Sequence, residues 1–215
     1  MKKSQTPARR RNAAATREAI LASARRAFAR AGFDGAGLRE IAGDAGVTAM
    51  LINRYFGSKE GLFGEVVAAT MAEPVILTAE NLNSPRLGET IAAMLINITR
   101  SGDTPLDGFL IMLHSTASVR ASEIGREQIE QGHQKTLATA LKGRLASERA
   151  ALVLAIVAGV QVMRQMIGLP ALAKADPDTL IKLLAPIFQH LVEDLSLVED
   201  PLPGSRGSRR SSKRR

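Results

Sequence analysis

The sequence predicts an all-α protein with an N-terminal three-helix domain followed by a larger helical domain. Ala, Leu, Arg and Glu, which favour helices, dominate the composition, and β-branched runs are few. Apolar residues recur at the three- and four-residue spacing of amphipathic helices, and Gly, Pro or capping residues separate these segments. A chain of 215 residues can form one or two domains with a sizeable core. We expect the two domains to cover residues 16–60 and 61–198.

The net charge of +8 is concentrated at the two ends of the chain. Residues 1–15 carry five basic residues and residues 204–215 carry six, and neither segment has an acidic residue. The body between them has 18 basic residues against 21 acidic ones, unlike a protein that coats nucleic acid with its whole surface. We expect residues 1–15 to be a disordered basic arm and residues 199–215 a disordered basic tail.

The first predicted helix covers residues 16–31, where apolar residues form a single stripe, and it ends at Gly32. Two shorter helices follow, at residues 38–45 and 49–56. Gly46 separates them, because glycine reaches positive φ without a Cβ clash. Thr48 is placed to cap the second short helix through its side chain.

The helix at residues 49–56 has two different faces. Its apolar side carries Leu51, Ile52, Tyr55 and Phe56, and its other side carries small, polar or basic residues. A helix, a turn with glycine and a second helix with a polar outer face form the DNA-binding helix-turn-helix geometry. The pattern by itself also fits an ordinary corner between two helices.

Three stretches resemble the signature of one family. IAGDAGVT at residues 41–48, RYFGSKEGLF at residues 54–63 and the preceding AFARAGFDGAG are similar to the TetR family of bacterial transcriptional regulators. The resemblance runs over about the first sixty residues without a gap. Gly37 stands where the family usually has Thr, and Asn53 stands where it usually has Tyr. The second difference bears on the operator sequence, because residue 53 is expected to touch DNA.

The resemblance implies a double-stranded DNA operator as partner. We expect Arg39 and Thr48 to contact phosphate or base edges, and Ala49 to lie on the same face. Met50 is suited to a thymine methyl group, and Asn53 to adenine in the major groove.

A second group is expected to hold the DNA backbone. Arg54 and Tyr55 belong to it by position, and the resemblance assigns Lys59 to a phosphate. A base in a first helical turn opposes the helix dipole, so helix stability does not explain Lys59, whereas a bound phosphate does. The arm before residue 16 is either a further groove or phosphate contact or a solvated tail.

The predicted second domain resembles the ligand-binding and dimerisation domain of the family in helix count and order only. Residues 150–160 are all apolar, too few to span a bilayer, so we predict a buried core helix and no membrane. The helices at about 147–167 and 177–195 resemble the family's four-helix dimer interface. A purely intramolecular bundle is the alternative.

Soft Met and Phe side chains cluster in the middle of this domain and suggest a pocket for an unknown small-molecule effector. The apolar candidates are Met94, Ile98, Phe109, Met112, Leu113 and Met163, and the polar candidates are His114, Arg120 and Gln161. The same apolar residues would equally serve to fill a core.

Catalytic and metal-binding patterns are missing from the sequence. No zinc-protease, nucleophile-elbow, phosphate-loop or dinucleotide motif occurs, and there is no Cys. The histidines stand far apart, so we predict no metal, no cofactor and no enzyme. The start of the chain lacks the apolar segment of a secretory signal, which favours a cytoplasmic, nucleoid-associated protein.

The sequence therefore predicts a sequence-specific transcriptional regulator, as a homodimeric repressor that a ligand releases from a palindromic operator. An architectural DNA-binding protein that relies on its basic ends is the alternative, and weak sequence preference would mark it. A helical adaptor without DNA binding fits less well, because the outer face of residues 49–56 keeps Asn53 and Arg54.

Overall fold

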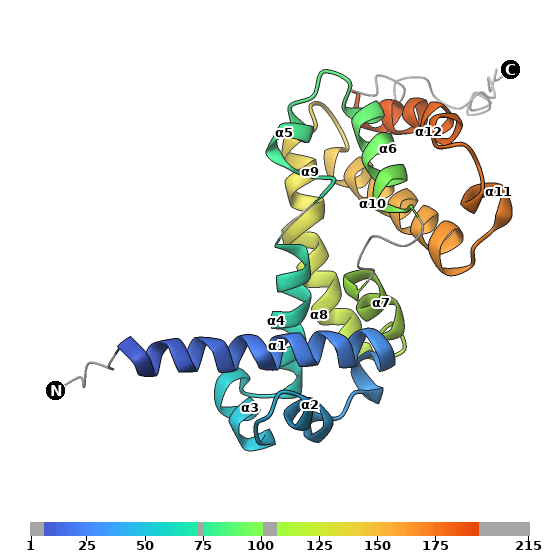
Figure 1. Cartoon of the computed structure of the whole chain (residues 1–215). Coiled ribbons are helices and arrows are strands. Elements are labelled where there is room, and N and C mark those ends of the chain that lie inside the picture. The colour runs from blue at the N-terminus through green and yellow to red at the C-terminus, as the bar shows by residue number, and fades with distance from the viewer. Residues whose placement is uncertain (1–6, 73–74, 101–106, 194–215) are drawn as a thin grey trace, which may run out of the picture.

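The computed structural model describes residues 7–72, 75–100 and 107–193, and within them it contains helices but no strands (Figure 1). The predicted all-α class is confirmed. The N-terminal helices are α1 (Pro7–Gly35), α2 (Leu38–Asp44), α3 (Ala49–Phe56) and α4 (Lys59–Met71). The remaining α-helices are α5 (Ala79–Leu82), α6 (Leu87–Ile98), α7 (Asp107–His114), α8 (Val119–Ile129), α9 (Lys135–Ala140), α10 (Ala146–Gln161), α11 (Pro170–Ala173) and α12 (Pro177–Val192). Two π-helical turns, η1 (Glu130–Gln134) and η2 (Val162–Met166), continue α8 and α10.

Helix α1 begins earlier than the sequence predicted. It starts at Pro7, so the expectation of a disordered arm is wrong for residues 7–15, while residues 1–6 lie outside the described part. Proline is well suited to a first helical position, and the alanines at residues 13–15 favour helix propagation. Gly32 has φ 66° and ψ −175°, which interrupts the regular helix where the sequence predicted its end.

The first hydrophobic core joins α1–α4 to the second part of the chain. Phe28, Phe33 and Phe63 meet at its centre, with ring centroids 5.1 Å apart for Phe28 and Phe63 and 5.2 Å apart for Phe33 and Phe63, both edge to face. Ile111 of α7 and Ala121 of α8 are fully buried in the same core. The N-terminal helices therefore share their core with two helices that follow residue 60.

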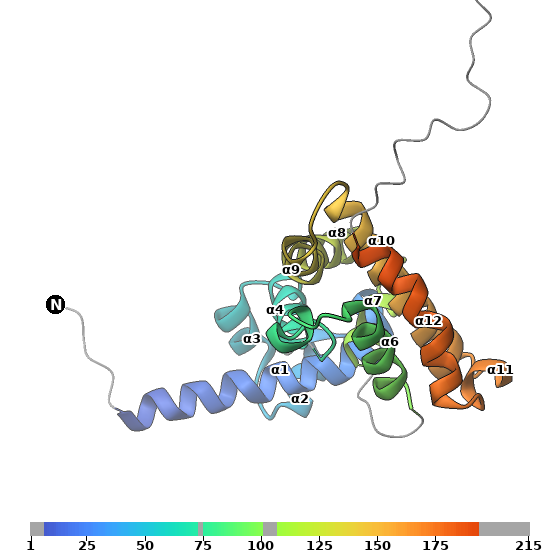
Figure 2. The ribbon, with the colours of Figure 1, turned by 90° about the horizontal axis from the view of Figure 1, so that it is seen from above.

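A second core lies between α6, α9, α10 and α12. In Figure 1, α4 and α8 run side by side from the first core towards this second one. Figure 2, seen from above, shows α12 lying along α10 at one edge of the molecule. The predicted basic tail at residues 199–215 lies outside the described residues.

Helix α10 is buried on one side only within a single subunit. With η2 it forms an apolar helix over Ala146–Met166 that is long and apolar enough to cross a membrane by length and composition alone, yet only 17% of its most apolar window is buried. One side, with Ala150 and Val153, packs into the second core, and the other side is exposed. The sequence predicts that the protein's own domain covers one side of this helix and that a second subunit can cover the other, and the second part stays a prediction.

Two arginines near the ends of this helix are buried. Arg149 donates to the carbonyl of Glu193 at 2.6 Å, just beyond α12. Arg164 donates to the carbonyl of Ile96 at 2.7 Å and to Oγ1 of Thr99 at 2.6 Å. Because carbonyls at helix C-termini carry partial negative charge, both cations are stabilised there and fasten the helix to α12 and α6.

Candidate nucleic-acid interface

The connection between α2 and α3 is a tight turn. Gly46 has φ 67°, as the sequence predicted, and the N–H of Val47 donates to the carbonyl of Ala42 at 2.9 Å. Thr48 occupies the N-cap position of α3 with extended backbone angles. Its side chain makes no capping hydrogen bond, so that part of the prediction is wrong. The hydroxyl group of this exposed residue is therefore not used within the helix.

Helix α3 has the two faces that its sequence predicted. Ile52 is fully buried and Phe56 is nearly so, and both belong to the first core. On the opposite side Met50 is 81% exposed, and Asn53 and Arg54 are exposed as well. Single exposed apolar residues are ordinary on a folded surface, so what distinguishes this face is the polar Asn53 and the basic Arg54 beside Met50.

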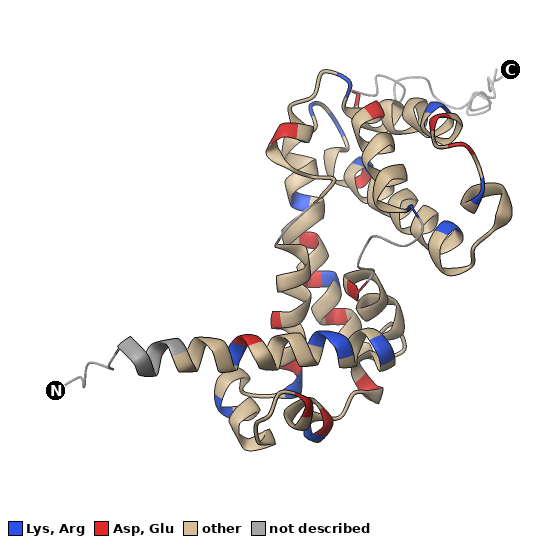
Figure 3. Cartoon of the chain, in the orientation of Figure 1, with Lys and Arg blue, Asp and Glu red and all other residues tan. Residues whose placement is uncertain are grey.

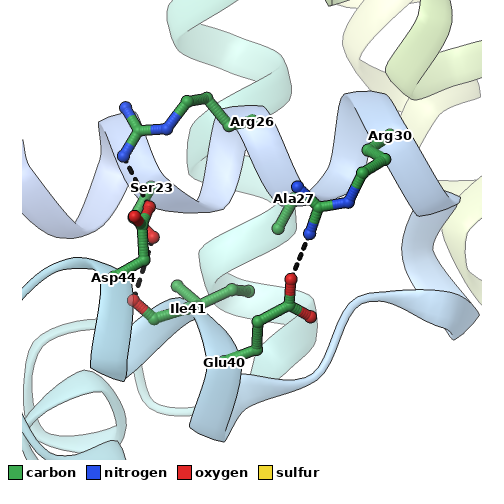
Figure 4. Close-up of a pocket in the computed structure, with 7 residues that line it drawn as sticks. All are labelled: Ser23, Arg26, Ala27, Arg30, Glu40, Ile41 and Asp44. Carbon is green, nitrogen blue, oxygen red and sulfur yellow. Dashed lines mark hydrogen bonds and ion pairs between the residues drawn. The ribbon is translucent and has the colours of Figure 1, made fainter.

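Two ion pairs hold α2 against α1. Arg26 lies 2.5 Å from Asp44, and Arg30 pairs with Glu40 (Figure 4). Each helix presents its two charged residues four positions apart, so that both pairs form along the same side of the contact. They flank a hollow of about 380 Å³, and its charged side chains are already paired with one another.

Ser23 adds a buried contact to the same pair of helices. Its Oγ donates to the carbonyl of Ile41 at 2.9 Å. The hydrogen bond from Arg26 to Asp44 lowers the pKa of the Asp44 carboxyl group below its ordinary value. The position of α2, and through the turn that of α3, is therefore fixed by polar contacts as well as by packing.

The basic residues of this domain fall into two groups. Four arginines of α1 have acidic partners, because Arg17 pairs with Glu65 and Arg25 lies 3.0 Å from Asp107, in addition to the pairs of Arg26 and Arg30. None of the ion pairs between described residues involves Arg39, Arg54 or Lys59. In Figure 3 the basic residues of α1 stand close to acidic ones. Within residues 12–72, the basic side chains outside these ion pairs are Arg39, Arg54 and Lys59, all predicted to contact DNA.

Lys59 lies at the start of α4, after Ser58, whose Oγ accepts from the N–H of Gly61 at 3.1 Å. Nζ of Lys59 lies 4.8 Å from the centre of the Phe33 ring and 3.4 Å from the carbonyl oxygen of Asp34. The ammonium group thus rests on the connection between α1 and α2 and keeps donors to spare, because it has three.

The other predicted DNA-contacting residues differ in exposure. Arg39 is exposed on α2, whereas Ala49 and Tyr55 are partly buried and pack against the first core. The eight residues all come from α2, α3, the turn between them or the first turn of α4, and they are Arg39, Thr48, Ala49, Met50, Asn53, Arg54, Tyr55 and Lys59. Their contacts with DNA remain a prediction.

The residues of the predicted ligand pocket lie on five different elements. Phe109, Met112, Leu113 and His114 are on α7, Met94 and Ile98 on α6, Arg120 on α8, Gln161 on α10 and Met163 on η2. Met112 packs against the first core, Arg120 pairs with Glu123 at 3.0 Å, and Met163 is 44% exposed.

Ile98 of α6 lies next to η2, because its carbonyl accepts from Gln165 at 3.4 Å. None of the nine residues lines either of the two hollows described for residues 7–72, 75–100 and 107–193. The pocket remains a prediction.

A second hollow, of about 640 Å³ and mostly apolar, opens between α10 and α12. Its lining residues are Leu152, Ile156, Pro186, Ile187, His190 and Leu191. The sequence indicates an open apolar face here, because the apolar stripe of α12 is wider than one neighbouring helix can cover.

Among the described residues, no group of three or more His, Cys, Asp or Glu is arranged to hold a metal ion.

A helix-turn-helix with an exposed outer face, set on an all-α fold with two cores, defines a DNA-binding transcriptional regulator. Comparison with known families agrees. The model described as "Bacterial regulatory proteins, tetR family" matches residues 20–66, and the model described as "Tetracyclin repressor-like, C-terminal domain" matches residues 86–192. The chain belongs to the TetR family of regulators, which are generally DNA-binding proteins without enzymatic activity.

Solved structures show the same fold. A TetR-family regulator from Streptomyces coelicolor A3 is 27% identical, with a TM-score of 0.55 over 83% of this chain and 95% of that one. GusR from Salmonella enterica is 17% identical, with a TM-score of 0.65 over 82% of this chain and 95% of that one. The fatty acid degradation regulator FadR from Bacillus halodurans is 14% identical, with a TM-score of 0.60 over 80% and 97%. No curated protein sequence matches the chain.

Proposed function

We propose that this protein is a cytoplasmic, nucleoid-associated homodimeric repressor that binds a palindromic operator and leaves it when a small-molecule effector binds. The observation that carries the proposal is the outer face of α3, where Met50, Asn53 and Arg54 are exposed on a helix whose other side is fixed in the first core. A helix in this setting enters the major groove, and its side chains meet base edges there.

The face formed by α10 and α12 supports the homodimer. Residues 150–163 and 183–192 contain no Lys, Arg, Asp or Glu, and Figure 3 shows these stretches largely in tan. Leu152, Leu183 and Ile187 are 53%, 63% and 49% exposed. An apolar surface of this kind is stabilised when a second copy covers it, and a two-fold pair of subunits matches the symmetry of a palindromic operator.

The arrangement of the two cores supports release by an effector. The second core lies away from the DNA-binding face, and α4 and α8 connect it with the first. Such an effector binds more tightly to a dimer whose two α3 helices no longer match the spacing of the major groove. It lowers the affinity for DNA by the amount of that preference.

The test is a selection of bound sequences from random double-stranded DNA with the full-length protein. A palindromic consensus with half-sites about one helical turn apart, bound by two subunits, is the expected result. Enrichment without a consensus would instead favour an architectural protein whose basic ends provide the affinity. Retention of no DNA at low salt would rule out both functions.

A further inference from the structure

The break in α1 separates two groups that a regular helix would join. In an uninterrupted α-helix the N–H of Phe33 would donate to the carbonyl of Ala29, four residues earlier. Gly32, with φ 66° and ψ −175°, turns the chain away from helical geometry between them. A backbone donor and a backbone acceptor near the first core therefore need other partners, because a buried unpaired group is costly.

The end of α7 supplies both partners. Nδ1 of His114 lies 2.7 Å from the carbonyl oxygen of Ala29, and the N–H of Phe33 donates to Oγ of Ser115 at 2.9 Å. Since a carbonyl oxygen can only accept, the imidazole donates through an Nδ1–H. Ser115 is 2% exposed, so its bond to Phe33 is shielded from water. One helical hydrogen bond is thus replaced by two bonds to α7 and its C-terminal end.

The two backbones also touch at this point. A Cβ atom added to Gly32 would stand 2.2 Å from the carbonyl oxygen of His114 and 2.7 Å from its carbonyl carbon. The distances leave no room for a side chain on Gly32, so the break in α1 and the end of α7 are in direct contact. Rigid contacts of this kind transmit displacements rather than absorb them.

Phe33 extends the connection towards the DNA-binding face. Its backbone is held by Ser115, while its ring lies 4.8 Å from Nζ of Lys59 and packs edge to face on Phe63 of α4. A displacement of Ser115 therefore reaches the start of α4 through a single residue. Lys59 is the basic residue there for which we expect a phosphate contact.

We propose that His114 and Ser115 are positioning residues for DNA binding: by holding the break in α1 they set the placement of α2, α3 and Lys59 relative to the second domain. The proposal rests on the proposed DNA-binding function and names the contact through which the second domain acts on it. Neither residue touches DNA in this arrangement, and each acts through the backbone of α1.

The test compares variants of the full-length protein on the sequence selected from random DNA. Ser115→Ala removes the acceptor and His114→Leu removes the donor, whereas His114→Asn keeps a donor at nearly the place of Nδ1. Ser118→Ala is the matched control, since Ser118 is also buried, caps α8 and follows three residues later. Three quantities are measured: operator affinity, melting temperature and the exchange rate of the Phe33 amide.

Ser115→Ala and His114→Leu are expected to weaken operator binding by about fivefold or more, in the range of typical coupling between sites. His114→Asn is expected to restore binding to within about twofold of the wild type. Ser118→Ala should lower the melting temperature without a comparable loss of affinity, and the Phe33 amide should exchange faster only in Ser115→Ala.

Several results would overturn the proposal. Unchanged affinity in Ser115→Ala together with faster exchange at Phe33 would show that the bond exists but does not position anything. An equal loss in Ser118→Ala would show that affinity follows stability alone. If Ser115→Ala does not fold, the pair His114→Leu and His114→Asn decides, and equal affinities would refute the role. A wild-type protein that selects no sequence would instead refute the proposed function, and this inference would fall with it.

Discussion

The guanidinium carbon of Arg17 lies 5.3 Å from the centre of the Phe56 ring, and the same side chain forms an ion pair with Glu65. Phe56 is the last residue of α3, and Glu65 belongs to α4. One arginine of α1 therefore contacts both α3 and α4. The cation–π contact acts on the end of α3, and the ion pair acts on α4.

We predict that Arg17→Met lowers the free energy of unfolding by about 0.5–1 kcal/mol, the usual size of an exposed cation–π contact. Methionine keeps the length of the side chain but loses the charge. Glu65→Gln is the control, because it removes the ion pair and leaves the guanidinium over the ring, and its cost should be smaller. Urea unfolding measures both. Equal losses in the two variants would assign the effect to the ion pair instead.

Asn53 should determine the base at one position of each half-site. Asn53→Ala is expected to cost roughly 1–3 kcal/mol of binding free energy on the preferred operator and to relax the preference at that single base pair. Binding to a set of operators with one base pair changed at a time measures the effect. An unchanged preferred sequence in the variant would show that Asn53 does not contact a base.

Lys59 should contribute affinity without specificity. Lys59→Ala is expected to weaken binding to all DNA sequences alike and to reduce the slope of log K against log salt concentration by about 0.9 for each subunit. Lys135→Ala, an exposed lysine on α9, is the control and should change neither. A loss confined to the preferred operator would contradict a phosphate contact.

The ion pair between Arg26 and Asp44 should make stability depend on pH. Because the folded-state pKa of Asp44 lies below its ordinary value of 3.8, the contribution is fully present above that value and is lost as the pH falls through the folded pKa. The difference in urea midpoint between the wild type and Asp44→Asn should therefore be constant near about pH 6 and shrink below 3.8. A difference that is the same in acid would exclude the carboxylate as its origin.

Leu183→Glu should separate the proposed dimer. A carboxylate at the centre of an apolar contact would lose its hydration without gaining a partner, so the dissociation constant should rise by at least about tenfold. Val119→Glu on α8, where the residue is 76% exposed outside the α10–α12 face, is the control. Light scattering over a dilution series gives the oligomeric state. Dimers of equal stability in both variants would place the interface elsewhere.

The parts of the fold that the sequence predicted well are those determined by local chemistry. Gly46, with its positive φ, needs only its neighbouring residues. The two faces of α3 likewise follow from spacing along one helix.

The features that the sequence did not predict depend on contacts between distant residues. Arg149 and Arg164 resembled flanking charges, and only the fold brings helix C-termini against them. The bond between Ser115 and Phe33 joins residues 82 positions apart and leaves no periodic trace in the sequence. The predicted ligand pocket was grouped by residue type, and type does not reveal that Met112 packs in one core and Met163 faces solvent.

The close approach between Gly32 and His114 is made by main-chain atoms of both helices. A substitution at residue 114 leaves its carbonyl group in place, whereas almost any substitution at residue 32 introduces a collision and a strained φ. During evolution, the side chain at residue 114 can therefore change while this backbone contact is kept. The spacing between α1 and α7 depends instead on one buried glycine, which has to stay a glycine.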